Sequence, residues 1–169
     1  NYALGAIGTL VSGTIWIISS VVVSLYDPQK GILTLFFGGM LIFPLSMMVG
    51  KLMRIKGDHH KDNPLGKLAM EGTIWMIMCI PLAYGASLVR AEWFFLGMML
   101  IIGGRYLTFA SIYGTRIYWI LGGVLGLTTF LLFSIQANSF ASALAGGLIE
   151  VIFGVILFVI YKSEKTKAS

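Results

Sequence analysis

The sequence predicts an all-α membrane protein with six transmembrane helices, arranged as three parallel-repeat helical hairpins in one compact bundle. Of its 169 residues, 57% are hydrophobic and only 11% are charged, and the mean hydropathy is +0.89. A soluble domain of this size keeps much of its surface in water, so it has no room to bury so many apolar side chains. Several apolar runs also reach the roughly 20 residues that cross a bilayer. We therefore expect a single transmembrane domain over residues 1–169 with almost no soluble part.

Six apolar segments are separated by polar or turn-forming residues. Asp27-Pro28-Gln29-Lys30-Gly31 is a predicted turn after the first span. Pro44 lies near the middle of the second span and is expected to kink that helix. Asn63 is expected to be the N-cap of the third helix, and Pro64 its first residue. The predicted spans are 3–26, 32–53, 65–88, 92–113, 117–135 and 140–161, with a polar cytoplasmic loop at 54–63 and a basic tail at 162–169.

The basic residues lie mainly in the connections on one side of the predicted bundle. Nine of the twelve belong to that side: Lys51, Arg54, Lys56, Lys61, Lys67, Arg116, Lys162, Lys165 and Lys167. The opposite side has only Lys30 and Arg90. Positive residues stay on the cytoplasmic side, so both termini are expected there. This placement favours contact with anionic membrane lipid and argues against a nucleic-acid partner, despite the net charge of +5.

The N-terminal residue is Asn rather than Met, so we expect a short preceding segment. The first apolar run is too long for the core of a signal peptide, and we interpret it as a span. The single cysteine, Cys79, lies inside an apolar run and is expected to be a small buried side chain.

An internal repeat is predicted from two matches at one offset. Gly13-Thr14-Ile15-Trp16 recurs as Gly72-Thr73-Ile74-Trp75, 59 residues later. The same offset places residues 36–42 on residues 95–101, with five of seven positions identical. The hairpins 3–53 and 65–113 are therefore predicted copies of one unit, with 117–161 as a weaker third copy. Two-span units keep one orientation, so we expect parallel repeats around an approximate three-fold axis.

Several short motifs in one order resemble a family of small bacterial membrane proteins. The motifs are Phe43-Pro44-Leu45, Gly50-Lys51-Leu52, residues 63–68 and Gly103-Gly104-Arg105-Tyr106 through Tyr113. That family is known as a domain of unknown function. The resemblance implies a bacterial inner-membrane protein of about six spans, and it implies no activity, substrate or catalytic residue.

Glu71 and Arg105 are ionisable residues inside predicted spans. Charges at membrane depth are costly and usually face a partner inside the protein. Counting 1.5 Å per residue, Glu71 lies about 9 Å and Arg105 about 12 Å from the same side of the membrane. Because their spans form a predicted hairpin, we expect them to meet as a buried ion pair. Such a pair either stabilises packing or binds a solute.

Glu150 lies near the centre of the last span, at the membrane midplane. Arg105 is a partner for it if the fourth and sixth spans are adjacent. Otherwise the acid is expected to be protonated and hydrogen-bonded to a neighbouring hydroxyl or carbonyl, because burial disfavours a charge. We regard Glu150 as the best candidate for a proton- or cation-binding group.

Aromatic residues supply the remaining binding candidates. Trp16 and Trp75 are equivalent in the repeat and are expected to fill volume within the bundle, each with a partner for its N–H. Tyr106 belongs to a cluster with Tyr113, Tyr118 and Trp119, which we interpret as an interfacial aromatic belt, with a stacking site for a planar or cationic solute as the alternative.

No catalytic motif, phosphate-binding loop or metal-ligand motif is present, so we predict neither an enzyme nor a cofactor. The polar segment around His59 and His60 is interpreted as a solvated loop, with a weak metal or pH-sensing site as the alternative. Small-residue spacings at Gly122/Gly126 and Ala143/Gly147 favour close helix contacts, within the bundle or in a homo-oligomer or with a partner subunit.

Two functions fit these features. The first is a small-solute or ion transporter or channel with an intramembrane polar centre at Glu71, Arg105 and Glu150. The second is a non-transporting membrane subunit, sensor or substrate-capture component of a larger complex.

Overall fold

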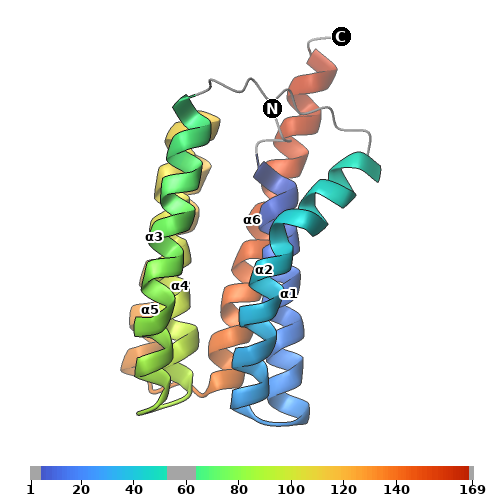
Figure 1. The fold of residues 1–169 in the computed structure, drawn as a ribbon. Helices are drawn as coiled ribbons and strands as arrows, with labels where there is room; N and C mark the ends of the chain where they lie inside the picture. Colours follow the sequence, from blue (N-terminus) through green and yellow to red (C-terminus); the bar gives the residue numbers. More distant parts are fainter. Residues whose placement is uncertain (1–4, 53–63, 168–169) are drawn as a thin grey trace.

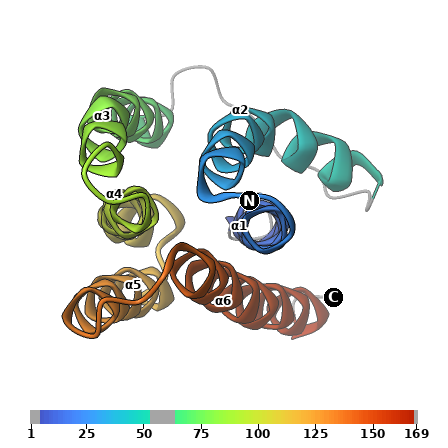
Figure 2. The same cartoon turned by 90° about the horizontal axis from the view of Figure 1, so that it is seen from below.

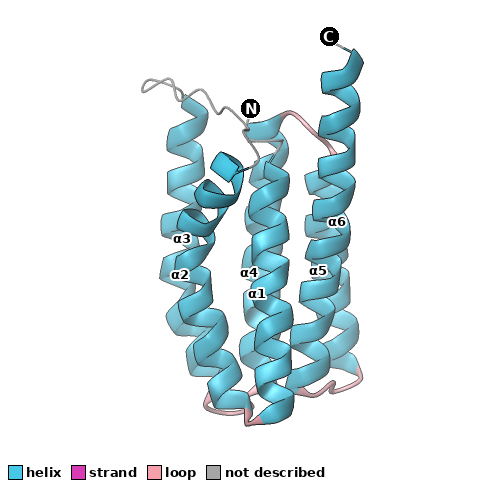
Figure 3. Cartoon of the chain, turned by 90° about the vertical axis from the view of Figure 1, so that its right-hand side faces the viewer, coloured by secondary structure: helices cyan, strands magenta, loops and turns pink. Residues whose placement is uncertain are grey.

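The structure is a computed structural model that describes residues 5–52 and 64–167. The described residues form six helices and contain no strand (Figures 1 and 3). The helices are α1 (Ala6–Leu25), α2 (Pro28–Leu52), α3 (Pro64–Ser87), α4 (Glu92–Tyr113), α5 (Ile117–Ser134) and α6 (Ser139–Lys167).

Each helix contains a stretch long and apolar enough to cross a membrane. The chain is therefore a multi-pass membrane protein, and the predicted six-helix all-α fold is confirmed. The α1–α2, α3–α4 and α5–α6 connections lie at one end of the bundle, at the bottom of Figure 1. We call this the connection end and the opposite end the terminal end. Helix α6 continues through Lys167 and so includes most of the predicted basic tail.

The helices form two groups of three. Helix α1 packs extensively against α6 and α2, whereas α4 packs extensively against α5 and α3. The groups meet mainly where α6 contacts α4 and α5 (Figure 2). Helices α1 and α4 are consequently central, and α2 and α3 are peripheral, with most of their surface outside the protein core. Those peripheral surfaces are apolar, which suits contact with lipid.

The predicted turn after the first span is shorter than expected. Helix α2 already begins at Pro28, because proline is tolerated in the first helical turn and Asp27 caps the helix. The Asp27 carboxylate accepts a hydrogen bond from the backbone N–H of Lys30 at 2.8 Å. This bond and the Lys30 ammonium, 3.1 Å from the other oxygen, hold the pKa of Asp27 below its ordinary value. The ionised cap therefore stabilises the fold at neutral pH, and this contribution is lost as the pH falls through that lowered pKa.

Helix α2 bends in its second half, where its terminal end leans over α1 (Figure 1). Pro44 lies in this half of the helix and lacks the N–H that would bond to the carbonyl of Met40. The predicted kink is thus present. Pro64 is the first residue of α3, as predicted, whereas its expected cap, Asn63, lies outside the described residues.

The predicted arrangement of three equivalent hairpins is not confirmed. Helices α5 and α6 contact each other much less than they contact α4 and α1, respectively. The repeat also relates unequal positions: the side chain of Trp16 is 1% exposed, whereas that of Trp75 is 50% exposed. The reason is that α1 is enclosed between α2 and α6, while α3 has only α4 as an extensive neighbour.

Candidate functional site

Glu150 is a fully buried carboxylic acid at the centre of the bundle. The apolar span of α6 covers Ser139–Ser163, and Glu150 lies one residue from its midpoint. Its side chain is 1% exposed and lies where α6 meets α1 and α4. An acid at this depth is expensive to ionise without partners, so its immediate contacts decide what it does.

The hydroxyl of Tyr106 on α4 donates a hydrogen bond to Oε1 of Glu150, over 3.1 Å. The Ser12 side chain on α1 also interacts with the carboxyl group. The second oxygen, Oε2, is buried and has no hydrogen-bond partner among the described residues. The expected contact with a neighbouring hydroxyl is therefore present. The free Oε2 leaves one position at which the acid can carry a proton or bind a cation.

Tyr106 does not belong to an interfacial belt, because it is buried in the bundle. Its ring stacks on the ring of Tyr118 at 5.7 Å, and Phe109 lies edge-on to both rings. Tyr118 is fully buried, whereas the neighbouring Trp119 is exposed. The belt was predicted from closeness in sequence, but α4 and α5 turn Tyr106 and Tyr118 inward against α1. The Thr9 side chain on α1 interacts with the hydroxyls of both tyrosines.

The predicted ion pair between Glu71 and Arg105 is not formed. The Arg105 guanidinium instead donates hydrogen bonds to Thr73 Oγ1 at 2.9 Å and to Met76 Sδ at 3.5 Å, and it lies over the Phe109 ring. Glu71 is exposed on the outer face of α3. The prediction rests on the depth of the two residues in the membrane and not on the helix face that each occupies. Glu71 and Thr73 are two residues apart, so their side chains are separated by about 200° of rotation around α3. Because Thr73 faces Arg105, Glu71 faces away from it.

Arg105 does not bind Glu150 directly either, although its charge acts on the carboxyl group. Arg105 and Tyr106 are consecutive, but their side chains contact different helices. Arg105 contacts α3, whereas Tyr106 contacts α6. The buried Nε of Arg105 has no hydrogen-bond partner within the described part of the chain. The three charged residues thus do not form one centre.

Trp16 fills volume beside the candidate site, as expected for a deep indole. It packs against Phe95 and against Gly146 on α6. Its N–H is buried without a hydrogen-bond partner in the described structure, contrary to the expected pairing. Trp75 lies against Gly104 of α4 at the periphery and does not approach Glu150.

Glycines bring α1 and α6 into close contact around Glu150. A Cβ atom added at Gly147 would meet the backbone N of Ile17 at 3.0 Å and the carbonyl oxygen of Gly13 at 3.1 Å. One added at Gly13 would meet the Cβ atom of Glu150 at 3.0 Å. The predicted close contact at Gly147 is therefore confirmed within the bundle. In α5 only Gly122 lies in a tight contact, with α4, while a Cβ atom at Gly126 would meet no atom within 4 Å.

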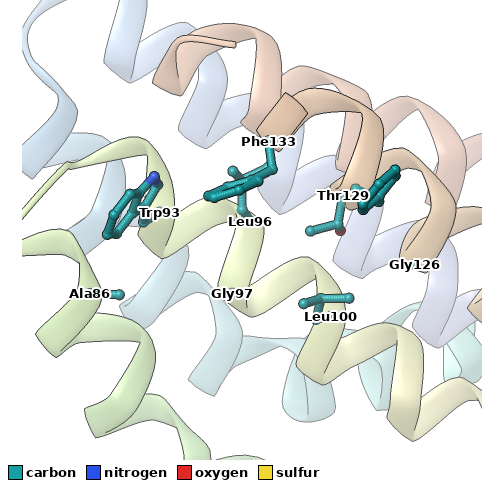
Figure 4. A pocket seen from close by; sticks show the side chains of 9 residues that line it. Ala86, Trp93, Leu96, Gly97, Leu100, Gly126, Thr129 and Phe133 are labelled. Carbon is teal, nitrogen blue, oxygen red and sulfur yellow. The ribbon is translucent and has the colours of Figure 1, made fainter. Parts of the chain in front are cut away.

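Two cavities lie toward the connection end, away from Glu150. The first, of about 410 Å³, lies between α3, α4 and α5, and Figure 4 shows Trp93, Leu96 and Phe133 around it. Its lining is almost entirely apolar, and the Thr129 hydroxyl is already bonded to its own helix at the Leu125 carbonyl. This cavity offers no group for acid–base chemistry.

The second cavity, of about 400 Å³, lies where the three connections at this end come together. We call it the vestibule. Its polar lining comes from the α3–α4 and α5–α6 connections and from the first residues of α4 and α6: Arg90, Glu92, Gln136, Asn138 and Ser139. Arg90 and Glu92 form an ion pair of 2.6 Å there. The vestibule can hold water and small ions at one end of the bundle.

Comparison with known families identifies the chain at the level of its family. A family of unknown function, DUF7010, matches residues 1–160. The chain belongs to this family. The resemblance to an uncharacterised family, a domain of unknown function, is thereby confirmed. No curated protein and no solved structure matches the chain.

The sequence interpretation missed the hydroxyl groups that surround the candidate site. Thr9 and Ser12 on α1 face the tyrosines and Glu150, and Thr73 is the partner of Arg105. Their spacing on α1 is compatible with one helix face, but spacing alone does not show which neighbouring helix that face meets. The described residues contain no group of three or more metal-ligating side chains, and His59 and His60 lie outside them.

Proposed function

We propose that this protein is a transporter or channel for a small cation, with the proton included in that class, and that Glu150 is its intramembrane binding group. The single observation that carries the proposal is the carboxyl group of Glu150. It is buried at the midpoint of a membrane span, is bonded by Tyr106 at one oxygen, and has a second oxygen without a partner among the described residues.

A merely structural acid at this position would be costly. An unpaired buried polar group destabilises a protein by about 1–3 kcal/mol, and a charged one by more. Reversible protonation or cation binding at Oε2 gives the residue a role that an apolar side chain does not have. The vestibule supports the proposal, because a route across a membrane needs a water-accessible mouth at one end.

Ion flux into proteoliposomes tests this function. The wild-type protein, reconstituted alone, should carry a proton or monovalent-cation current down an imposed gradient, and Glu150→Gln should reduce this flux at least tenfold, because the amide neither ionises nor carries the proton. Asp27→Asn is the matched control, since it makes the same chemical change in the α1–α2 connection and still caps α2. Equal flux through the wild type and Glu150→Gln would refute the proposal.

The second candidate function is a membrane subunit, sensor or substrate-capture component. The apolar outer faces of α2 and α3 favour it, since they offer surface to a partner subunit or a second copy as well as to lipid. This function predicts no flux through the purified protein and an association with another membrane protein that substitutions on α2 or α3 disrupt. Arg105, with Thr73 beside it, is then a structural group of the α3–α4 hairpin.

We further infer that the protein resides in a bacterial inner membrane with its terminal end on the cytoplasmic side. The distribution of Lys and Arg supports this orientation. We also propose that residues 3–53 and 65–113 descend from one duplicated hairpin. Its support is the shared offset of 59 residues between two separate matches. The different environments of the two copies would then reflect later divergence.

A further inference from the structure

Three buried polar atoms without a partner lie along the contact between α1 and α6. They are Oε2 of Glu150, Oγ of Ser142 and Nε1 of Trp16. The only other such atom in the described part of the chain is Nε of Arg105, whose guanidinium points toward α3. Buried polar groups in proteins are nearly always hydrogen-bonded, and ordered water supplies the bond where protein does not.

These atoms share one stripe because of helix geometry. On α6, Ser142, Gly146 and Glu150 are four residues apart and so face the same side. Ser20, Trp16 and Ser12 have the same spacing on α1, which runs antiparallel to α6 (Figure 1). Trp16 packs on Gly146, between the levels of Ser142 and Glu150. Ser142 and Glu150 are eight residues apart, which is about 12 Å along α6.

The stripe reaches toward both ends of the bundle. Ser139 lines the vestibule and lies one turn before Ser142 on α6. Beyond Glu150, the hydroxyls of Tyr106, Tyr118 and Thr9 continue toward Gly5 at the terminal end. Thr9 donates to the Gly5 carbonyl, and Gly5 has a φ of 76° at a position where a Cβ atom would collide with the Tyr118 hydroxyl.

We propose that this stripe is a proton pathway, in which water bridges the vestibule, Ser142, Trp16 and Glu150, and the tyrosine hydroxyls continue the route beyond Glu150. The inference rests on the proposed function and narrows its substrate to the proton. Along the route a proton arrives through hydrogen-bonded water, occupies Oε2 of Glu150, and leaves through the hydroxyl groups around Tyr106, so that no other species is consumed.

The surroundings of Glu150 favour a proton over a metal cation. The groups that face it are Tyr106 and the Arg105 charge from α4, Tyr118 beyond Tyr106 on α5, and Ser12 from α1. Metal cations such as Mg²⁺ and Ca²⁺ require six or more oxygen ligands, and Glu150 is the only carboxylate at the site among the residues that the structure describes.

Proton flux in proteoliposomes, followed by an entrapped pH-sensitive dye, tests the pathway. Ser142→Val should lower the flux about tenfold, because it replaces the hydroxyl that orients the bridging water with two apolar methyl groups. Ser134→Val on α5 is the matched control, since that hydroxyl bonds to its own helix at the Phe130 carbonyl and is exposed. Wild-type flux through Ser142→Val would overturn the pathway.

The outcomes separate the pathway from the function on which it rests. If Glu150→Gln abolishes flux while Ser142→Val preserves it, the ion reaches Glu150 by another route, and only the pathway fails. If flux is independent of Glu150, the proposed function itself fails. Proton flux without sodium or potassium flux is the result expected for the substrate, and selective metal-ion flux would overturn the proton assignment.

A labelling experiment tests the pathway even if Ser142→Val does not fold. In a Cys79→Ser background, the thiol introduced by Ser142→Cys should react with a membrane-impermeant methanethiosulfonate added at the vestibule side. Ser139→Cys is the positive control at the vestibule, and Leu125→Cys, in the buried part of α5, is the negative control. No reaction at position 142, with reaction at position 139, would overturn a water-filled route.

Discussion

The Tyr106 hydroxyl donates a hydrogen bond to Oε1 of Glu150 over 3.1 Å. We expect Tyr106→Phe to lower the free energy of unfolding by about 1–3 kcal/mol, because it leaves a buried acceptor without its donor. Thermal unfolding in detergent, followed by tryptophan fluorescence, measures this loss. Tyr84→Phe is the control, since Tyr84 is half-exposed on α3 and should leave the midpoint unchanged. Equal stability of Tyr106→Phe and the wild type would show that the Glu150 carboxyl does not depend on this bond.

Arg105 allows a second test at the scale of single residues. The structure pairs Arg105 with Thr73 and not with Glu71. In double-mutant cycles, Arg105→Met and Thr73→Val should therefore show a coupling of about 0.5–3 kcal/mol, whereas Arg105→Met and Glu71→Gln should be additive within about 0.5 kcal/mol. Midpoints of thermal unfolding in one detergent provide both values. Coupling between Arg105 and Glu71, with additivity between Arg105 and Thr73, would instead support the ion pair that was predicted from depth alone.

At the scale of helices, the contact between α1 and α6 depends on glycine at positions that approach the neighbouring backbone. Gly147→Ala should destabilise the protein by about 1–3 kcal/mol, because the new Cβ atom would press on Ile17 and Gly13. Gly126→Ala is matched in chemistry but meets no neighbour, so it should be neutral or stabilising by up to about 1 kcal/mol. Unfolding midpoints of the two variants should differ accordingly, and equal midpoints would contradict the close approach.

The central and peripheral helices also differ in what their sequences reveal. Helices α1 and α3 share the Gly-Thr-Ile-Trp string, yet one is enclosed and the other faces outward. Local sequence determines that both are helical and apolar. It does not determine how many neighbours each helix acquires, because in a membrane the core-facing and lipid-facing sides are equally apolar.

At the scale of the whole molecule, the distribution of charge predicts the orientation in the membrane. A fluorescent protein that folds only in the cytoplasm should fluoresce when fused after Ser169, and a phosphatase that is active only outside should be active when inserted after Gln136. These readouts follow from the Lys and Arg bias toward the terminal end. Phosphatase activity at the C-terminus and fluorescence at position 136 would show the opposite orientation in the membrane, with the vestibule on the cytoplasmic side.

Much of the architecture was predictable from the sequence. The number of helices, their approximate bounds, the kink at Pro44 and the start of α3 at Pro64 are local properties of hydropathy and backbone chemistry. The depth of Glu150 was equally accessible, because helical rise converts residue number directly into distance along the membrane normal. Its partner was left open between Arg105 and a neighbouring hydroxyl or carbonyl, because depth alone does not choose among them.

Only the tertiary structure decided which side chains meet. Consecutive residues point about 100° apart on a helix, so Arg105 and Tyr106 reach different neighbours once α3 and α6 are placed on different sides of α4. The packing of α1 on α6 likewise brings Trp16 onto Gly146, between Ser142 and Glu150. The sequence by itself therefore determined the helices and the depth of each charge, whereas partner choice followed from helix packing, which depends on contacts between residues distant along the chain.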